Sequence, residues 1–189
     1  MASASPRRRE LLGRLGIPFE VHASNIPEEH PALPPAQAIA AVALAKALAV
    51  AATVDRAPAL ILGADTEVVL DGRLLGKPRD GADAARMLRD LRGREHEVIT
   101  GLAVVDLEAP GATPRQETTS VTSRVRMGDY DDAVIEAYVA TGEPLDKAGA
   151  YAVQGLGGRL VAAVDGCLTN VVGLPMTTVR ALLERRGLR

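Results

Sequence analysis

Aromatic side chains are scarce in this sequence, which has one Phe, three Tyr and no Trp. Proteins that bind single-stranded nucleic acid stack bases on aromatic rings, and this chain has few rings to offer. An excess of positive charge is also missing, since the formal net charge is −2, whereas proteins that neutralise many phosphates are usually basic. We therefore expect no nucleic-acid partner; an RNA-binding N-terminal arm, the alternative, would depend on arginines 7–9 alone.

Cysteine occurs once, at Cys167, which excludes an internal disulfide and favours a reducing compartment. A nucleophilic cysteine would need a histidine partner in space, and the chain has only three histidines. No apolar run reaches the roughly 18 residues of a membrane span, because Lys46 interrupts the alanine-rich segment 38–52. No apolar segment follows the N-terminal arginines, as it would in a secretory leader. We expect a cytoplasmic protein without a membrane partner.

Lysine is rare as well. The 22 basic residues comprise 19 Arg and only three Lys, at Lys46, Lys77 and Lys147. Arginine presents a planar fork, whereas lysine presents a compact ammonium on a flexible stem. In a chain this rich in arginine, a lysine indicates a position that requires a compact ammonium group. All three lysines are therefore candidate site residues.

Apolar periodicity and turn signals alternate between helix and strand along the chain. Helices are predicted over 6–16, 36–54, 81–93, 130–142 and 175–187, strands over 19–22, 59–65, 96–108, 116–127 and 159–166, and a loop over 109–115. A hairpin is predicted over 67–77, where Asp71 and Gly72 separate two apolar runs. The sum is an α/β protein with a mixed β-sheet.

The N-terminal segment predicts a capped helix with three arginines in its first turn. Ser5 is a favoured N-cap residue, and Pro6 fits the first helical position because its missing N–H has no partner there. Arg7, Arg8 and Arg9 then lie at the partially positive helix N-terminus, which costs free energy unless an anion binds. A phosphate would accept hydrogen bonds from the helix amides and the guanidinium groups. Arginines that extend into solvent are the alternative.

A second charged group follows the apolar run 59–64, which leads into Asp65 and Thr66, with Lys77 on the return of the hairpin. A carboxylate at the end of a buried strand needs a compensating cation. A metal ion, Lys77 or an arginine would serve, and a purely structural Asp–Lys pair is also open.

A third charged group lies in the segment 145–158, which combines Lys147 and Gln154 with several glycines. Glycine lets the backbone approach a ligand closely, although it equally marks tight turns. The G-x-G-x-x-G and G-x-x-x-x-G-K-[ST] nucleotide-binding loops do not occur.

Five motifs in this chain, in order and spacing, resemble those of the Maf family of nucleoside triphosphate pyrophosphatases: SASPRRRELL, GADT, GKP, DKAGAYAVQG and NVVGLP. The resemblance covers nearly the whole chain. It implies a single Maf-like domain over residues 1–189, with two lobes around a central cleft and an elongated mixed β-sheet, similar to inosine triphosphate pyrophosphatase. It also implies metal-dependent hydrolysis of surplus or modified nucleoside triphosphates to the monophosphate and pyrophosphate.

The resemblance assigns roles to single residues of this chain. Asp65 matches the proton acceptor, and Glu28 matches an acidic site residue. We expect these two carboxylates to bind the metal ion, Mg²⁺ or Mn²⁺, because hard oxygen ligands suit these cations. Arg7, Thr66 and Gln154 match the positions that select the substrate. The residues expected to contact the substrate are Ser3, Arg7, Arg8, Glu28, Lys46, Thr66, Lys77, Lys147 and Gln154.

The combination SPRR, ADT and YAVQG resembles the branch of the family that acts on dTTP and UTP. The branch acting on 7-methyl-GTP carries Trp in place of the first of these arginines, and remains an alternative. A second alternative is a nucleotide sensor without catalysis that regulates septum formation and cell division. A homodimer is common in the family.

Overall fold

Two compact units make up the described part of the chain. The structure is a computed structural model that describes residues 1–109 and 113–188. Unit 1 comprises Met1–Asp65, Thr100–Val121 and Gly173–Arg189, and unit 2 comprises Thr66–Ile99 and Thr122–Val172. Residues 110–112 of the loop predicted over 109–115 lie outside the described residues.

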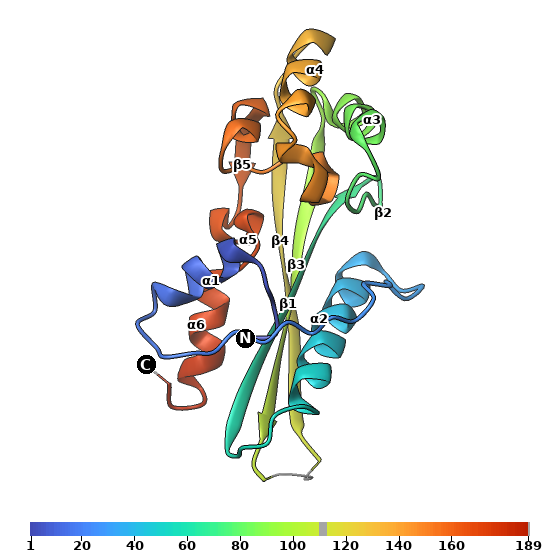
Figure 1. The fold of residues 1–189 in the computed structure, drawn as a ribbon. Helices are drawn as coiled ribbons and strands as arrows, with labels where there is room; N and C mark the ends of the chain where they lie inside the picture. The colour runs from blue at the N-terminus through green and yellow to red at the C-terminus, as the bar shows by residue number, and fades with distance from the viewer. Residues whose placement is uncertain (110–112, 189) are drawn as a thin grey trace. The chain divides into compact units, whose positions relative to one another are not determined.

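A five-stranded sheet has the strand order β2-β1-β3-β4-β5 (Figure 1). Its strands are β1 (Ala59–Leu70), β2 (Arg73–Leu74), β3 (Glu95–Leu107), β4 (Arg115–Met127) and β5 (Val161–Asp165). Val69 pairs with Leu74 and Arg124 with Asp165, and both strand pairs are antiparallel. The α/β class is confirmed, whereas these pairs are antiparallel where we expected a mixed sheet.

The turn between β1 and β2 explains the antiparallel pairing at that edge. Asp71 and Gly72 have φ angles of 51° and 76°, the positive values that a two-residue hairpin turn requires. Such a turn joins antiparallel strands directly. β1 also runs on to Leu70 without a break, so Asp65 lies inside the strand. The predicted strand, 59–65, had placed Asp65 at its end. The apolar residues after Glu67 continue the buried run up to the turn.

In unit 1, helix α2 (Pro35–Ala51) packs closely on β1 and β3. A Cβ atom on Gly63 would lie 2.2 Å from the carbonyl oxygen of Ala43, and one on Gly101 would lie 2.6 Å from the backbone nitrogen of Ala40. Any side chain at these two strand positions would therefore collide with the helix backbone. The alanines of α2 and the glycines of the strands let the helix lie this close. A long side chain of α2 can therefore reach a side chain on β1.

The N-terminal segment of unit 1 lies along β1 and leads into helix α1 (Pro6–Gly13). The amide of Ala2 donates to the carbonyl oxygen of Leu62 at 2.8 Å, and the Ser5 side chain accepts from the amide of Arg8 as the predicted N-cap. The strand expected over 19–22 does not form. The C-terminal helix α6 (Met176–Glu184) closes unit 1 as predicted.

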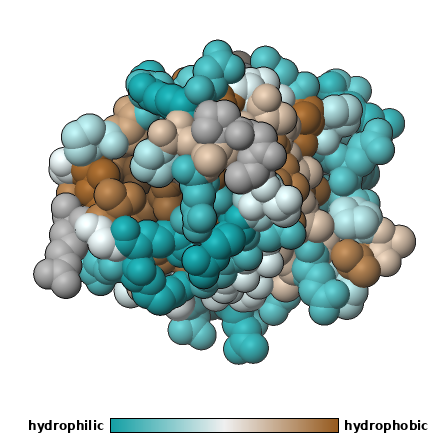
Figure 2. All heavy atoms as spheres, turned by 90° about the horizontal axis from the view of Figure 1, so that it is seen from below, coloured by the Kyte–Doolittle hydropathy of each residue, from teal (hydrophilic) through white to brown (hydrophobic). Residues whose placement is uncertain are grey.

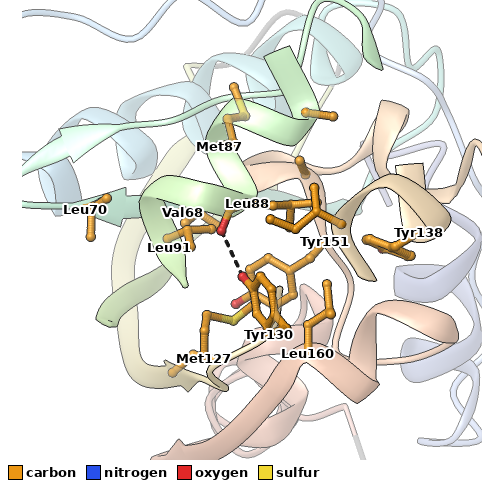
Figure 3. Packing of buried hydrophobic residues seen from close by; sticks show 14 of the residues in the cluster. Val68, Leu70, Met87, Leu88, Leu91, Met127, Tyr130, Tyr138, Tyr151 and Leu160 are labelled. Carbon is orange, nitrogen blue, oxygen red and sulfur yellow. Dashed lines mark hydrogen bonds between the residues drawn. The ribbon is translucent and has the colours of Figure 1, made fainter. Parts of the chain in front are cut away.

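Unit 2 is built around an apolar cluster beneath helices α3 (Gly81–Leu91) and α4 (Asp132–Ala140) (Figure 3). The hydroxyl of Tyr130 donates to the carbonyl oxygen of Leu88 at 2.9 Å and so joins the segment between β4 and α4 to α3. Unit 2 also contains α5 (Leu168–Val172) and three 3₁₀ segments that the sequence did not predict, η1 (Glu143–Asp146), η2 (Ala148–Ala150) and η3 (Leu156–Leu160).

A buried histidine lies in the core of unit 2. His96 is 3% exposed, and its Nε2 lies 2.7 Å from the hydroxyl oxygen of Tyr151. Its other ring nitrogen, Nδ1, has no hydrogen-bond partner among the described residues. Burial lowers the pKa of His96 from 6.5 to about 4, because the charged ring would lose its hydration inside the core. The folded chain therefore holds the neutral imidazole near pH 7.

Lowering the pH from 7.5 to 5 is expected to reduce the free energy of unfolding by about 2 kcal/mol through His96 alone. Between pH 6.5 and about 4 the unfolded chain binds more protons than the folded one, so stability falls as the pH falls through that window. In His96→Gln, whose amide can still bond to Tyr151 but does not titrate, urea unfolding at the two pH values should show a loss about 2 kcal/mol smaller. Equal losses in both proteins would contradict this.

Hydrophilic side chains cover most of the face drawn in Figure 2, with smaller apolar areas between them. Among the described residues, none of the helices has the length and apolar character that crossing a membrane requires.

Candidate active site

Asp65 and Lys46 form a buried ion pair within unit 1. Asp65 lies on β1 and is 4% exposed, and Lys46 lies on α2 and is 5% exposed. Lys46 Nζ donates to Asp65 Oδ1 at 2.7 Å. The close packing of α2 on the glycines of β1 and β3 lets a lysine of the helix reach a carboxylate of the strand. Lys46 is thus a compensating cation for Asp65, a role for which the sequence had suggested a metal ion, Lys77 or an arginine.

Glu28 supplies a second carboxylate to the same ammonium group. Its Oε1 accepts from Lys46 Nζ at 2.6 Å, and its side chain is 42% exposed. Lys46 therefore links one buried and one partly exposed carboxylate. The loop that carries Glu28 has no regular secondary structure and leads through Pro34 into α2. Glu28 and Asp65, the two predicted metal ligands, thus both accept a hydrogen bond from Lys46 Nζ.

His30 contacts the other oxygen of Asp65. Its Nε2 lies 2.9 Å from Asp65 Oδ2, and its side chain is 14% exposed. A carboxylate only accepts hydrogen bonds, so Nε2 carries the hydrogen in this pair. His30 was not among the site residues expected from the sequence, because a histidine in a proline-rich loop has no periodicity that would place it against a strand. In the sequence, its position two residues after Glu28 was the feature that pointed to a place in the site.

Arg8 uses its guanidinium group to join three parts of unit 1. Nη1 donates to the carbonyl oxygen of Ala64 at 2.9 Å and to Ser3 Oγ at 3.1 Å, and Nε donates to the carbonyl oxygen of Gly173 at 2.9 Å. These bonds attach α1 to the backbone of β1 one residue before Asp65. Of the three arginines expected at the helix N-terminus, Arg8 is therefore held by the protein itself, while Arg7 is half-buried and Arg9 is exposed.

The side chains of this cluster include types that bind divalent cations. His30 and Asp65 offer an imidazole nitrogen and a carboxylate oxygen, and Glu67 is the second residue after Asp65 on β1. Because side chains alternate along a strand, Glu67 is directed to the same face as Asp65. The donor set therefore fits a divalent cation, with oxygen ligands predominating.

A family model described as Maf-like protein matches residues 1–186 of this chain. The chain belongs to the Maf family.

Several curated proteins are similar to this Maf chain over nearly its full length. One named dTTP/UTP pyrophosphatase from Moorella thermoacetica is 55% identical over 188 residues, covering 99% of this chain and 94% of that protein. One of the same name from Gloeobacter violaceus is 51% identical, with 97% and 93% covered. Another from Pelotomaculum thermopropionicum is 45% identical, with 99% and 95% covered.

The remaining motif residues of this Maf chain lie in unit 2. The amide of Gly149 donates to the carbonyl oxygen of Gly76 at 2.8 Å, and so joins the turn before Lys77 to the segment that carries Lys147. A Cβ atom on Gly149 would lie 2.8 Å from the side chain of Val68, and its φ of 67° is positive, so glycine is required there on two grounds. The two lysine motifs are thereby held together by backbone contacts.

Lys147 and Gln154 are placed differently in the second of these segments. Lys147 is half-buried, contacts the carboxylate of Asp146 and donates to the carbonyl oxygen of Glu143 at 3.3 Å. The Glu143 carboxylate also accepts the amides of Leu156 and Gly157, which fixes the loop after Gln154. Gln154 itself is exposed.

Thr66 lies half-buried on β1 directly after Asp65, and Lys77 is exposed. Unit 1 thus holds Ser3, Arg7, Arg8, Glu28, Lys46 and Asp65, and unit 2 holds Thr66, Lys77, Lys147 and Gln154.

Proposed function

We propose that this Maf protein hydrolyses dTTP and UTP to the monophosphate and pyrophosphate, with Asp65 as the proton acceptor. The observation that carries the proposal is the buried Asp65, held by Lys46 on one oxygen and His30 on the other, at the position of the family's acidic motif. Relatives about half identical to this chain bear the name dTTP/UTP pyrophosphatase. Clearing surplus or modified pyrimidine nucleotides is the role this activity would serve.

A divalent cation, Mg²⁺ or Mn²⁺, would be held by Asp65 and Glu28. When bound, such an ion lowers the pKa of a coordinated water and offsets triphosphate charge. The carboxylate oxygens of the cluster suit these hard cations. The exposure of Glu28 leaves its carboxylate accessible from solvent, while Asp65 is shielded.

Asp65 would accept a proton from the water that attacks the α-phosphorus, while the bond to the bridging α–β oxygen breaks and pyrophosphate leaves. Each carboxylate oxygen has two lone pairs, so Oδ1 and Oδ2 can accept a further hydrogen bond beside those from Lys46 and His30. The two existing bonds fix the carboxylate in one orientation, which is the requirement for a positioned base. Arg8 holds the adjacent Ala64 carbonyl, and so supports the same stretch of β1.

The positive side chains would stabilise the charge on the phosphates and on the departing pyrophosphate. This contribution is mainly electrostatic. Arg7 beside the N-terminus of α1 supplies a guanidinium group, and Ser3 a hydroxyl. Lys77 and Lys147 of unit 2 would supply compact ammonium groups, which is the property that made the few lysines of this chain candidate site residues.

Thymine and uracil would be selected by Gln154, together with Arg7 and Thr66. These bases present two carbonyl acceptors on either side of one N–H donor. An amide both donates and accepts hydrogen bonds and matches this edge, whereas a carboxylate only accepts. A site built to pair with a polar edge discriminates against bases that leave its groups unpaired.

Pyrophosphate release from a panel of nucleotides tests the proposal. We expect dTTP and UTP to be hydrolysed faster than ATP, GTP and 7-methyl-GTP, with all release abolished by EDTA and restored by Mg²⁺ or Mn²⁺. Gln154→Glu should lower kcat/KM for dTTP more than for GTP, because the carboxylate cannot donate to the base. Gln116→Glu, at an exposed position of β4 in unit 1, is the matched control and should behave as wild type.

A preference for purine nucleotides, or an equal loss for every nucleotide in Gln154→Glu, would contradict the assignment of the base. Nucleotide binding without any pyrophosphate release would instead favour the sensor alternative. Full activity after exhaustive chelation would contradict the requirement for a metal ion.

A further inference from the structure

The carboxylate of Asp65 has different partners on its two oxygens. Oδ1 accepts from Lys46 Nζ at 2.7 Å, and Oδ2 lies 2.9 Å from His30 Nε2. The ammonium group has no lone pair, so it cannot bind a metal ion. The imidazole does have a ligating nitrogen, once its hydrogen is on Nδ1. Oδ2 and Nε2 are therefore one pair of atoms that a cation can share, beside the carboxylate oxygens of the cluster.

The spacing of these two atoms already fits adjacent ligands of one ion. In an octahedral site with bonds of about 2.1 Å, neighbouring ligand atoms lie about 3.0 Å apart. Oδ2 and Nε2 are 2.9 Å apart. A cation bound to both atoms would lie to one side of the line that joins them, so the imidazole has to turn toward it while the two atoms keep their separation. The hydrogen of Nε2 moves to Nδ1 when the metal bond forms, so the ring stays neutral.

The net charge of the groups around Asp65 in unit 1 favours a bound cation at this position. Asp65 and Glu28 contribute two negative charges, and Lys46, which binds both, contributes one positive charge. Asp65, Glu28, Lys46 and a neutral His30 together have one surplus negative charge. Because Asp65 is 5% and Lys46 6% exposed in their side chains, solvent screens this charge poorly. A bound cation would offset it.

We propose that His30 is a nitrogen ligand of the divalent cation and that it gives this site a preference for Co²⁺, and to a smaller degree Mn²⁺, over Mg²⁺. Imidazole nitrogen suits the later first-row metals, whose affinities rise from Mn²⁺ to Co²⁺, whereas Mg²⁺ takes oxygen ligands and retains its waters. The proposal rests on the proposed function only in taking this cation to be the one used in hydrolysis.

Calorimetric titration of the whole protein with Co²⁺ and, separately, with Mg²⁺ tests the proposal without reference to turnover. Wild type should bind Co²⁺ at least about tenfold more tightly than Mg²⁺. His30→Gln should weaken Co²⁺ binding about tenfold or more and leave Mg²⁺ binding within about twofold. The amide of glutamine can still donate to Asp65 Oδ2, and its oxygen is a ligand that Mg²⁺ accepts.

His22→Gln is the matched control, because His22 also pairs with a carboxylate, that of Glu20 at 3.1 Å, but its side chain is 45% exposed. It should leave both affinities unchanged. Thermal unfolding of each variant confirms that the fold is kept.

An equal loss for both ions in His30→Gln would show that His30 merely orients Asp65, and would overturn the proposal. So would a wild-type protein that binds neither ion at millimolar concentration, or one that binds both equally. Pyrophosphate release from dTTP, measured on the same samples with Mg²⁺, separates the two proposals. Hydrolysis without a Co²⁺ preference rejects His30 as a ligand, and a Co²⁺ preference without hydrolysis rejects the activity.

Discussion

Asp65→Asn is expected to lower kcat for dTTP by at least about 100-fold, the smaller end of what a general base contributes. The amide has no basic site for a proton from water, but it has nearly the shape of the carboxylate. Its oxygen can accept from Lys46, and its NH₂ group can donate to His30 Nε2 in the other tautomer. The fold and nucleotide binding should therefore be kept, and the loss should appear in kcat in steady-state pyrophosphate release.

Asp71→Asn is the matched control for this variant. Asp71 is an exposed carboxylate that pairs with Arg94, and its φ of 51° is a conformation that asparagine adopts readily. Its kcat should remain within about twofold of wild type, since an exposed ion pair contributes little. If Asp65→Asn kept more than about a tenth of the wild-type kcat, Asp65 would not be the base.

Lys46→Met is expected to lower the free energy of unfolding by about 3 kcal/mol and to abolish activity. Methionine retains the apolar stem of the side chain but leaves Asp65 buried without its ammonium partner. Removing one member of a buried ion pair is costly because the remaining charge has lost its hydration. For a chain of this length the loss corresponds to a Tm lower by roughly 6–12 °C. Urea unfolding monitored by circular dichroism measures it.

Two variants show whether the buried carboxylate causes this loss. Glu28→Gln removes the charge of the partly exposed partner of Lys46 and should cost less than about 1 kcal/mol, because water can replace that contact. In the Asp65→Asn background, Lys46→Met should cost clearly less than it does alone, since no buried charge is then left unpaired. Equal costs in the two backgrounds would mean that Lys46 acts through packing alone.

Local signals were sufficient to predict the longer helices and most strands of this chain. Ser5 before Pro6 predicted the start of α1, and its side chain caps the helix as expected. The alanine-rich run predicted α2, whose strong helix formers need no apolar stripe to define it. The Asp71–Gly72 pair predicted the hairpin, because few other residues adopt positive φ at low cost. Each of these features is decided by interactions within a few residues.

Other features depend on contacts between distant parts of the chain, and the sequence predicted them incompletely. The segment 19–22 has the composition of a strand but does not form one. Arg8 was expected to contact the substrate, and no local pattern indicated that its guanidinium group also binds backbone carbonyls on β1 and at Gly173. His30 was not among the expected site residues at all, and it contacts Asp65 across 35 positions of sequence.

The sequence by itself determined the family of this protein, the order of its main elements and the residue types of its site, because motifs and periodicity are written in the order of residues. Only the tertiary structure decided which groups meet. Lys46 reaches Asp65 because Gly63 and Gly101 let α2 lie directly on the strands. Which side chains can pair depends on the distance between the backbones of α2 and the strands. A local sequence pattern does not determine that distance.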